Sequence, residues 1–526
     1  MNPTSIPYQQ TGYFSSFICD YLNQTSAVKP FYNRYPSLEN FKDQIEEKRL
    51  SFRSETRNLI TQVLQNQYTE LNASLLTQKN IELLQEENTF TITTGHQLNL
   101  FTGPLYFLYK IISTINLCEE LSKIYPEQNF VPIYWMATED HDFEEINYFN
   151  FKGKKVKWDK AFGGAVGELT TEGLDRVFKT FSNQLGPGKN AAKLKSLFSE
   201  AYLKHNNLAE ATLYLANELF GEYGLVIVDA NNKQLKQEFA PFVEIELLEQ
   251  RTYEQVSKTN DKLSKLQVNP REINLFYLQD GIRERIIQEK DLYTVNNTNV
   301  SFTKKEILKH LHEVPERFSP NVLLRPLYQE VILPNLCYIG GGGELAYWLQ
   351  LKSTFQAFQV PFPMLLLRNS ALVIKEQQSN TLNRLELSVE ELFCKQEELL
   401  AKKTKDSSNL KIDFSSQKEF LQEQFKELYS IAEQTDKSFI GAVAAQEKKQ
   451  LNGLANLEKR LLRAEKRNHS DYLSRVVEIQ NELFPKQSLQ ERQLNFSELY
   501  LEYGEDLISI LKEELKPLDF RFKVLS

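Results

Sequence analysis

The chain has 526 residues, and this length favours about three folding units of about 150 residues each over one ordinary domain. Lys and Arg number 62 against 70 Asp and Glu, a formal net charge of −8, which argues against nucleic acid as the main partner. No basic leader precedes an apolar run at the N-terminus and no uncharged apolar stretch of about 18 residues occurs, so we expect a soluble, cytoplasmic protein without a membrane segment.

Residues 1–85 are mostly polar with a helical pattern, and we interpret them as a helical lead-in. From residue 90 short apolar runs alternate with helical stretches, which is typical of βαβ units and a largely parallel sheet. We therefore assign residues 86–375 to a Rossmann-like α/β core.

The first βαβ unit of this core is the clearest. Residues 90–94 predict a strand, and residues 131–136 predict a second one that is apolar throughout, as in a strand covered on both faces. Between them, Pro104 suits the first position of a helix. Apolar residues recur on one face of that helix at Leu108, Ile111, Ile112, Ile115, Cys118 and Leu121.

Further apolar runs predict later strands of the same sheet at residues 225–228, 336–339 and 364–367. Two intervening stretches, near residues 150–220 and 250–315, do not follow this alternation. We interpret both stretches as insertions in the core.

Residues 376–485 predict an α-helical coiled coil, and residues 486–526 a helical segment that returns to the core. A first seven-residue stripe comprises Leu382, Leu385, Val389, Leu392 and Leu399, and a second comprises Leu454, Leu457, Leu461, Ala464, Val476, Ile479 and Leu483. A turn between antiparallel helices suits residues 402–416. The apolar seam favours a homodimer through the coiled coil, and internal three-helix packing is the alternative.

The first candidate site is the run Thr94, Gly95, His96 and Gln97 at a strand end. A glycine there allows close backbone approach, and an imidazole can donate to a phosphate oxygen. Gly103 would add free N–H groups at the start of the next helix. The alternative is an ordinary turn with a histidine in it.

The second candidate is Glu139, Asp140, His141 and Asp142, directly after the apolar strand at residues 131–136. These groups would repel one another unless solvent, Mg²⁺ or a cationic ligand such as a substrate ammonium compensates them. A carboxylate could instead accept the proton of an amine nucleophile, with His141 as a relay. The alternative is a solvated acidic turn that caps the next helix.

The third candidate is the four-glycine run of Gly340, Gly341, Gly342 and Gly343, which could form a nest of N–H groups for an anion. No Walker sequence is present, so a P-loop NTPase is disfavoured. Arg325 precedes this unit and could bind an anion through two N–H groups. The alternatives are a flexible turn and an arginine on a helix surface. Arg368, which follows the strand at residues 364–367, is a weaker fourth candidate.

The chain offers no other metal or disulfide chemistry. Its four cysteines are far apart and form no CxxC pair, and its six histidines include no HExxH motif. We therefore predict neither a disulfide framework nor a protein-held transition-metal centre.

Together and in order, these pieces resemble the BshC family, the cysteine-adding enzymes of bacillithiol biosynthesis. The resemblance covers nearly the whole chain, with a coiled-coil region in the same place. The matching pieces are residues 94–97 with 101–106, then 139–142, 319–326, 338–347 and 489–492.

The resemblance implies a core similar to class I aminoacyl-tRNA synthetases, with connecting insertions and a coiled coil that pairs two subunits. It also implies a ligase that joins the carboxyl group of L-cysteine to the amine of glucosaminyl-malate. In class I enzymes an HxGH element binds ATP phosphates, and Gly95 and His96 are placed similarly. The first histidine of that element is absent here, and no KMSKS lysine loop is evident.

On this basis we hypothesise that Thr94, Gly95, His96, Gln97 and Gly103 hold the phosphates of ATP or ADP. Asp140, His141 and Asp142 would orient the amine or Mg²⁺. Glu139, Arg325, Gly341, Gly342 and Gly343 would bind substrate, including the malate carboxylates. The other interpretations are a nucleotide-binding scaffold that recruits partners and a nucleotidyltransferase acting on another acid.

Overall fold

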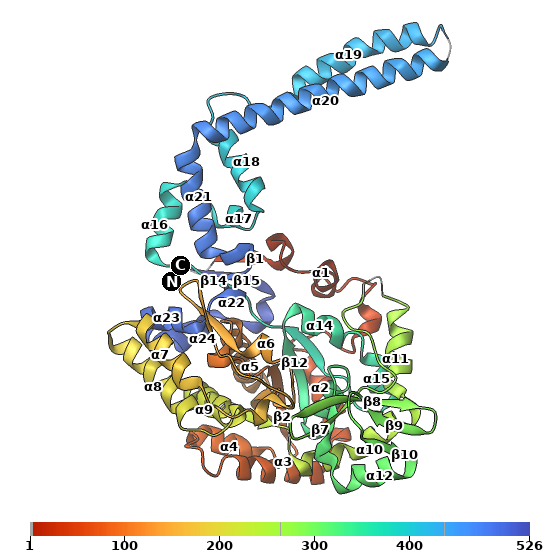
Figure 1. The fold of residues 1–526 in the computed structure, drawn as a ribbon, viewed down its shortest axis with the longest axis vertical. Coiled ribbons are helices and arrows are strands. Elements are labelled where there is room, and N and C mark those ends of the chain that lie inside the picture. The colour runs from red at the N-terminus through yellow and green to blue at the C-terminus, as the bar shows by residue number, and fades with distance from the viewer. Residues whose placement is uncertain (1–3, 264, 436) are drawn as a thin grey trace. The chain divides into compact units, whose positions relative to one another are not determined.

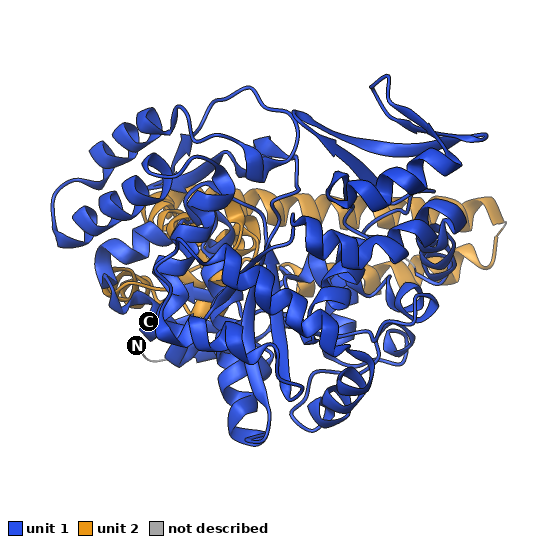
Figure 2. Cartoon of the chain, turned by 90° about the horizontal axis from the view of Figure 1, so that it is seen from below, with its two compact units in different colours: residues 1–372, 490–525 blue, residues 373–489, 526 orange. Residues whose placement is uncertain are grey.

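The computed structural model describes residues 4–263, 265–435 and 437–526. The chain divides into two compact units, which Figure 2 shows in different colours. Unit 1 comprises residues 1–372 and 490–525, and unit 2 comprises residues 373–489 and 526. No helix in the described part of the chain is long and apolar enough to cross a bilayer.

The core of unit 1 is a five-stranded parallel sheet in the order β13-β12-β2-β3-β6. Its strands are β2 (Thr89–His96), β3 (Asn129–Met136), β6 (Val226–Asp229), β12 (Asn335–Gly340) and β13 (Met364–Leu367). Read from β6, this is the strand order 3-2-1-4-5 of a Rossmann fold, so the predicted core is confirmed. The order reverses between β2 and β12, and the crevice outside their carboxyl ends is where such folds bind ligands.

Helix α5 (Tyr106–Ile124) packs against β2 and β3, as the apolar pattern predicted. Leu117, Cys118 and Leu121 join Phe90 and Ile92 in the hydrophobic core. The helix begins at Tyr106 and not at Pro104. The reason is a turn with positive φ at Phe101, Thr102 and Gly103, which delays helical geometry.

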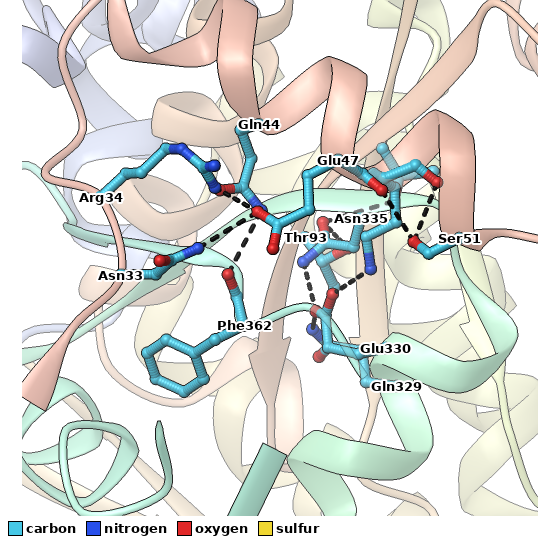
Figure 3. Close-up of polar contacts among 12 residues, drawn as sticks. Asn33, Arg34, Gln44, Glu47, Ser51, Thr93, Gln329, Glu330, Asn335 and Phe362 are labelled. Atoms are coloured by element: carbon cyan, nitrogen blue, oxygen red, sulfur yellow. Dashed lines mark hydrogen bonds and ion pairs between the residues drawn. The ribbon is translucent and has the colours of Figure 1, made fainter. Parts of the chain in front are cut away.

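A buried polar network supports the sheet at the amino end of β12. Thr93 Oγ1 donates to Asn335 Oδ1 (2.9 Å), and Asn335 Nδ2 donates to Glu330 Oε1 (2.6 Å), as Figure 3 shows. Glu330 pairs with Lys48 of α2 (Asn40–Ser51) at 2.9 Å, and both side chains are at most 1% exposed. Glu330 belongs to α13 (Arg325–Ile332), so this pair anchors the helix that begins with Arg325.

The N-terminal segment is helical, as predicted, but it also contributes a strand. Strand β1 (Thr4–Pro7) pairs antiparallel with the C-terminal strand β15 (Arg521–Leu525). The remaining helices of the segment are α1 (Ser16–Leu22), α3 (Ser54–Gln67) and α4 (Leu75–Leu83). The C-terminal part of unit 1 adds α22 (Gln490–Gln493), α23 (Phe496–Tyr503) and α24 (Asp506–Glu514).

The first insertion is a hairpin followed by helices. Its elements are α6 (Phe143–Ile146), β4 (Tyr148–Phe151), β5 (Lys154–Lys157), α7 (Leu174–Leu185), α8 (Lys189–Leu203) and α9 (Leu208–Phe220). Phe101, in the turn after β2, packs between the rings of Phe149 and Phe198 at centroid distances of 5.5 and 5.3 Å. This contact ties the insertion to the end of β2.

The second insertion contains a five-stranded antiparallel sheet in the order β10-β9-β8-β7-β11. The elements are α10 (Lys233–Glu249), α11 (Arg251–Asn260), β7 (Leu275–Gln279), β8 (Ile282–Glu289), β9 (Leu292–Val295), β10 (Ser301–Thr303), α12 (Lys304–Glu313) and β11 (Phe318–Pro320). Helices α14 (Gly342–Trp348) and α15 (Lys352–Ala357) then lie between β12 and β13, and β14 (Ala371–Val373) follows β13.

Unit 2 is helical, and its longest part is the hairpin of α19 (Ser415–Ala432) and α20 (Lys437–Asn468), seen in Figure 1. Phe425, Ala432 and Val443 form the buried contact between the two helices. A turn between helices was predicted within residues 402–416, and a connection lies there, since α18 (Gln396–Ser407) ends and α19 begins only at Ser415. The turn of the hairpin of α19 and α20 follows Ala432 and was not predicted.

The predicted stripe from Leu382 to Leu399 is not one continuous helix. It is divided among α16 (Glu376–Arg384), α17 (Val389–Leu392) and α18. Ser388 ends the continuity because its side chain caps α17 together with Glu391, and a capping box starts a new helix. The second stripe is correct, since it covers α20 and, after a break at His469, α21 (Ser470–Leu483).

Candidate active site

A cavity of about 770 Å³ opens at the carboxyl ends of β2, β3 and β12. It therefore lies at the point where the strand order reverses. Segments far apart in the sequence meet in it. The predicted site residues that line it are Gly95, His96, Gln97, Glu139, Asp140, His141, Asp142, Arg325, Gly341 and Gly343.

Three predicted site residues do not line this cavity. Thr94 Oγ1 donates to the carbonyl oxygen of Ile339 (2.7 Å), which is a contact within the sheet. The N–H of Gly103, expected to be free for a phosphate, donates to Leu100 O (2.9 Å), so that expectation is wrong. Gly342 packs against α1, where a Cβ atom would meet Ile18 at 3.5 Å.

His96 lies in the cavity wall as a neutral imidazole. Burial, helped by the positive charge of Lys110, lowers the pKa of His96 to about 3. Its ring packs against Tyr106 and Phe107 at centroid distances of 5.5 and 5.0 Å. Its Nε2 atom is buried and has no hydrogen-bond partner among the described residues. A ligand atom is the natural partner for this nitrogen.

The glycine loop is closed by an acidic side chain that the sequence analysis did not single out. Glu344 accepts the N–H of Gly341 (2.8 Å) and the hydroxyl of Tyr338 (2.7 Å), and it pairs with Lys110 Nζ at 2.7 Å. Lys110 also donates to Gly95 O (2.6 Å). Burial would raise the pKa of Glu344, but Lys110 and the hydrogen bonds from Gly341 and Tyr338 together outweigh burial and lower the pKa. One anionic position of the loop is thus already filled by the protein.

The acidic strand end is ordered by hydrogen bonds. Asp140 accepts from Gln97 Nε2 (2.9 Å) and from the N–H of His141 (2.7 Å). Burial would raise the pKa of Asp140, but the hydrogen bonds from His141 and Gln97 outweigh it and hold the pKa at about 2. Glu139 forms an ion pair with Lys236, which also donates to Phe318 O (2.8 Å).

The compensating cation of this cluster is Arg283, from β8. Its Nη1 lies 2.7 Å from Nδ1 of His141. Ligand atoms of Asp140, His141 and Asp142 lie within 4.8 Å of one another, a spacing that a metal could use. Because a guanidinium already contacts His141 and amide groups already occupy Asp140, this donor set fits N–H donors better than a metal ion.

The cavity is strongly basic although the chain is acidic. Lys110 and six arginines line it against four carboxylates, those of Glu139, Asp140, Asp142 and Glu344. The arginines are Arg271, Arg283, Arg285, Arg325, Arg368 and Arg492. Among the described residues, only Arg368 of these six forms an ion pair, with Glu491 at 2.7 Å.

Two of these arginines are held rigidly at the β12 and β13 ends. The Arg325 guanidinium lies 5.5 Å from the ring centroid of Trp135 and 5.7 Å from that of Tyr338. Its Nη1 donates to Gln329 Oε1 (3.1 Å). Arg368 is oriented by the buried Glu491, and its Nε atom has no partner in the described part of the chain.

Sequence reasoning missed several cavity residues. Lys110 carried a usable signal, because it is the only charged residue between residues 106 and 118 of the predicted helix. Arg283 and Arg285 carried none, because they alternate with other polar residues in an insertion that had no predicted contact with the site.

Comparison with known proteins identifies relatives along the whole chain. The family description "Bacillithiol biosynthesis BshC, N-terminal Rossmann-like domain" matches residues 1–369. The description "Bacillithiol biosynthesis BshC, C-terminal coiled-coil domain" matches residues 371–526. Both parts of the resemblance drawn from the sequence are confirmed.

Three relatives carry the name "Putative cysteine ligase BshC". The protein of Christiangramia forsetii is 58% identical over 533 residues, which cover 100% of this chain and 99% of the relative. That of Flavobacterium johnsoniae is 58% identical over 523 residues, 99% of each chain. That of Cytophaga hutchinsonii is 38% identical over 523 residues, 99% of this chain and 98% of the relative.

Proposed function

The chain belongs to the BshC family of bacillithiol biosynthesis, and we propose that it is a ligase that joins the carboxyl group of L-cysteine to the amine of glucosaminyl-malate. Formation of this amide bond would complete bacillithiol. Two relatives that carry the name of a cysteine ligase are 58% identical to this chain over nearly their full length, and this similarity supports the same chemistry here.

The observation that carries the proposal is the excess of positive charge in the cavity. Lys110 and six arginines face only four carboxylates, in a chain whose net charge is −8. Unpaired guanidinium groups in a partly buried site are costly unless an anion neutralises them. The carboxylate of cysteine, the two carboxylates of the malate part and the phosphates of a nucleotide are such anions.

We propose that ATP binds in the crevice outside the carboxyl ends of β2 and β12 and that AMP or ADP is released. His96, Gln97, Lys110 and Arg368 converge there, and the Nε–H of Arg368, which has no partner among the described residues, suits a phosphate oxygen. The neutral His96 directs its one N–H to Thr102, so its Nε2 can accept a hydrogen bond from a hydroxyl or an amino group of the nucleotide. ATP would supply the activation that a free carboxylate needs before an amine can attack it. Any Mg²⁺ would arrive with the nucleotide, because Arg283 already lies against His141 at the acidic strand end.

The acidic strand end suits the amine. Asp140, with its pKa near 2, stays ionised at neutral pH and attracts an ammonium group. A group with such a low pKa is a weak base, so Asp140 orients the nucleophile and does not remove its proton. His141 and Asp142 complete the polar edge beside it.

The test is to incubate the full chain with L-cysteine, glucosaminyl-malate, ATP and Mg²⁺ and to follow the conjugate by mass spectrometry. We expect the conjugate, with AMP formed if the carboxyl group is adenylated and ADP if it is phosphorylated. Asp140→Asn should lower the rate at least tenfold. Glu144→Gln is the matched control, because Glu144 lies outside the cavity lining and its side chain is 79% exposed. Absence of product with all nucleotides and metals would refute the proposal.

We also propose that the chain pairs with a second copy through the hairpin of unit 2. Phe420 and Leu457 are 67% and 52% exposed and line one groove on α19 and α20. Ile431 is exposed as well, at 54%. Light scattering should give the mass of a dimer for the full chain and of a monomer for Phe420→Glu combined with Leu457→Glu. A monomer in both cases would contradict the pairing.

A further inference from the structure

Strand β8 of the second insertion presents two arginines to the cavity. Arg283 and Arg285 are separated by one residue, so their side chains point to the same face of the strand. Both line the cavity at the end of β3. On the neighbouring strand β7, Phe276 pairs with Arg285, and its ring lies 4.0 Å from the guanidinium of Arg283.

The two guanidinium groups have unused hydrogen-bond donors. The Nε atoms of Arg283 and Arg285 are both buried, and neither has a partner among the described residues. The other contacts of Arg283 are to Nδ1 of His141 (2.7 Å) and to Oγ of Ser319 (3.5 Å), so no carboxylate is paired with it. An orphaned N–H on a buried cation costs free energy comparable to a lost charged hydrogen bond.

The carboxylates near these arginines have other partners. Glu139 is paired with Lys236, and Asp140 accepts from Gln97 and from a backbone N–H. Among the described residues neither Arg283 nor Arg285 forms an ion pair, so the unpartnered Nε–H groups of both can still bind the anion of a ligand. Arg271, which also lines the cavity and is exposed, adds a third positive charge at its rim.

We propose that Arg283 and Arg285, with Arg271 at the rim, form a carboxylate subsite that binds the dicarboxylate part of the amine substrate. The inference rests on the proposed function and assigns substrate selection to the second insertion. Arginine suits this task because its planar fork matches a carboxylate with two parallel hydrogen bonds. Since Arg283 touches His141, one molecule can place its carboxylates on β8 and its amine beside Asp140.

The experiment measures binding by calorimetry with the full chain, using glucosaminyl-malate, its dimethyl ester and ADP as separate probes. The wild type should bind the diacid at least tenfold more tightly than the diester. Arg285→Met should lower the affinity for the diacid about tenfold or more and leave the affinities for the diester and for ADP unchanged. Arg285→Lys should restore part of the loss, because it returns the charge without the fork. Glu284→Gln is the matched control, since Glu284 lies between the two arginines and accepts from Asn297 (3.2 Å).

Three results would overturn the subsite. The first is an equal loss of affinity for the diacid and the diester in Arg285→Met. The second is a loss of affinity for ADP alone, which would identify the arginines as a phosphate site. The third is an unchanged affinity for the diacid. Circular dichroism shows whether Arg285→Met folds, and Arg285→Lys supplies the comparison if it does not. If the wild type forms the conjugate and Arg285→Met binds the diacid as tightly as the wild type does, the subsite is refuted and the ligase proposal is not. Selective diacid binding by a chain that forms no conjugate refutes the ligase alone.

Discussion

Replacing His96 with Gln should make unit 1 more resistant to acid. The folded chain keeps this imidazole buried and neutral, with a pKa of about 3 against an ordinary value of 6.5. Between these two values the unfolded chain binds one more proton than the folded chain. Stability must therefore fall as the pH falls from about 6.5 towards 3, and a side chain that cannot titrate abolishes that loss.

The size of the effect follows from the distance in pH. At pH 4.5 the unfolded imidazole is two pH units below its own pKa, while the folded one is still neutral. Each unit is worth about 1.4 kcal/mol, so the wild type should lose about 2.7 kcal/mol from this residue between pH 7.5 and 4.5. His96→Gln should lose that much less over the same interval.

The assay is urea unfolding at the two pH values, followed by tryptophan fluorescence. The three tryptophans, Trp135, Trp158 and Trp348, all belong to unit 1, so the signal reports this unit. His96→Asn serves as a second variant. It should differ from His96→Gln in packing but show the same change with pH, because both remove the proton site. If both variants lose as much stability as the wild type at pH 4.5, the burial argument for His96 fails.

Further substitutions test the packing and the backbone. Lys48→Met should cost unit 1 about 3–5 kcal/mol, because it leaves the buried Glu330 without its cation, and Lys48→Met combined with Glu330→Leu should recover part of the loss in the same urea assay. Gly224→Ala should lower the stability of unit 1 by about 1–3 kcal/mol, because φ is +76° there and a Cβ atom would lie 2.6 Å from Asn80 Nδ2. Gly441→Ala should stabilise unit 2 by about 0.5–1 kcal/mol, because this glycine lies inside α20 with open space around it. Circular dichroism should show a higher helicity and a higher melting temperature for this variant.

The parts of the fold that sequence predicted well are those where local pattern and tertiary role agree. Residues 131–136 are apolar throughout, and they form a central strand with sheet neighbours on both sides. The stripe from Leu382 to Leu399 has the right spacing for one helix. It is nevertheless broken at Ser388, because an N-cap with Glu391 three residues later outweighs heptad spacing. Helix α5 begins later than predicted because of the turn at residues 101–103. The backbone of this turn has positive φ, and Phe101 in it packs against Phe198 of the first insertion, which the local sequence does not indicate.

The site was predictable at strand ends and not in the insertions. His96 and Asp140 follow strands of the core, and the rule that parallel strands present their carboxyl ends at one edge brings them together. Arg283 reaches the same cavity from an antiparallel sheet about 140 residues away in sequence, as its contact with His141 shows. A single sequence carries no signal for that approach, because hairpins in an insertion have no fixed position relative to the core.

The charges of the cavity explain why the glycine loop differs from a phosphate-binding loop. The N–H of Gly341 is bound by Glu344, a carboxylate of the chain itself, and Lys110 neutralises that carboxylate. The groups that remain for anion recognition are the guanidinium groups of Arg325 on α13, of Arg368 directly after β13, and of Arg283 and Arg285 on β8. Backbone N–H groups at one helix end can hold one phosphate, whereas separated guanidinium groups can hold several anions at once. That is the requirement of a reaction in which a carboxylate, a dicarboxylate sugar and a nucleotide must occupy one cavity.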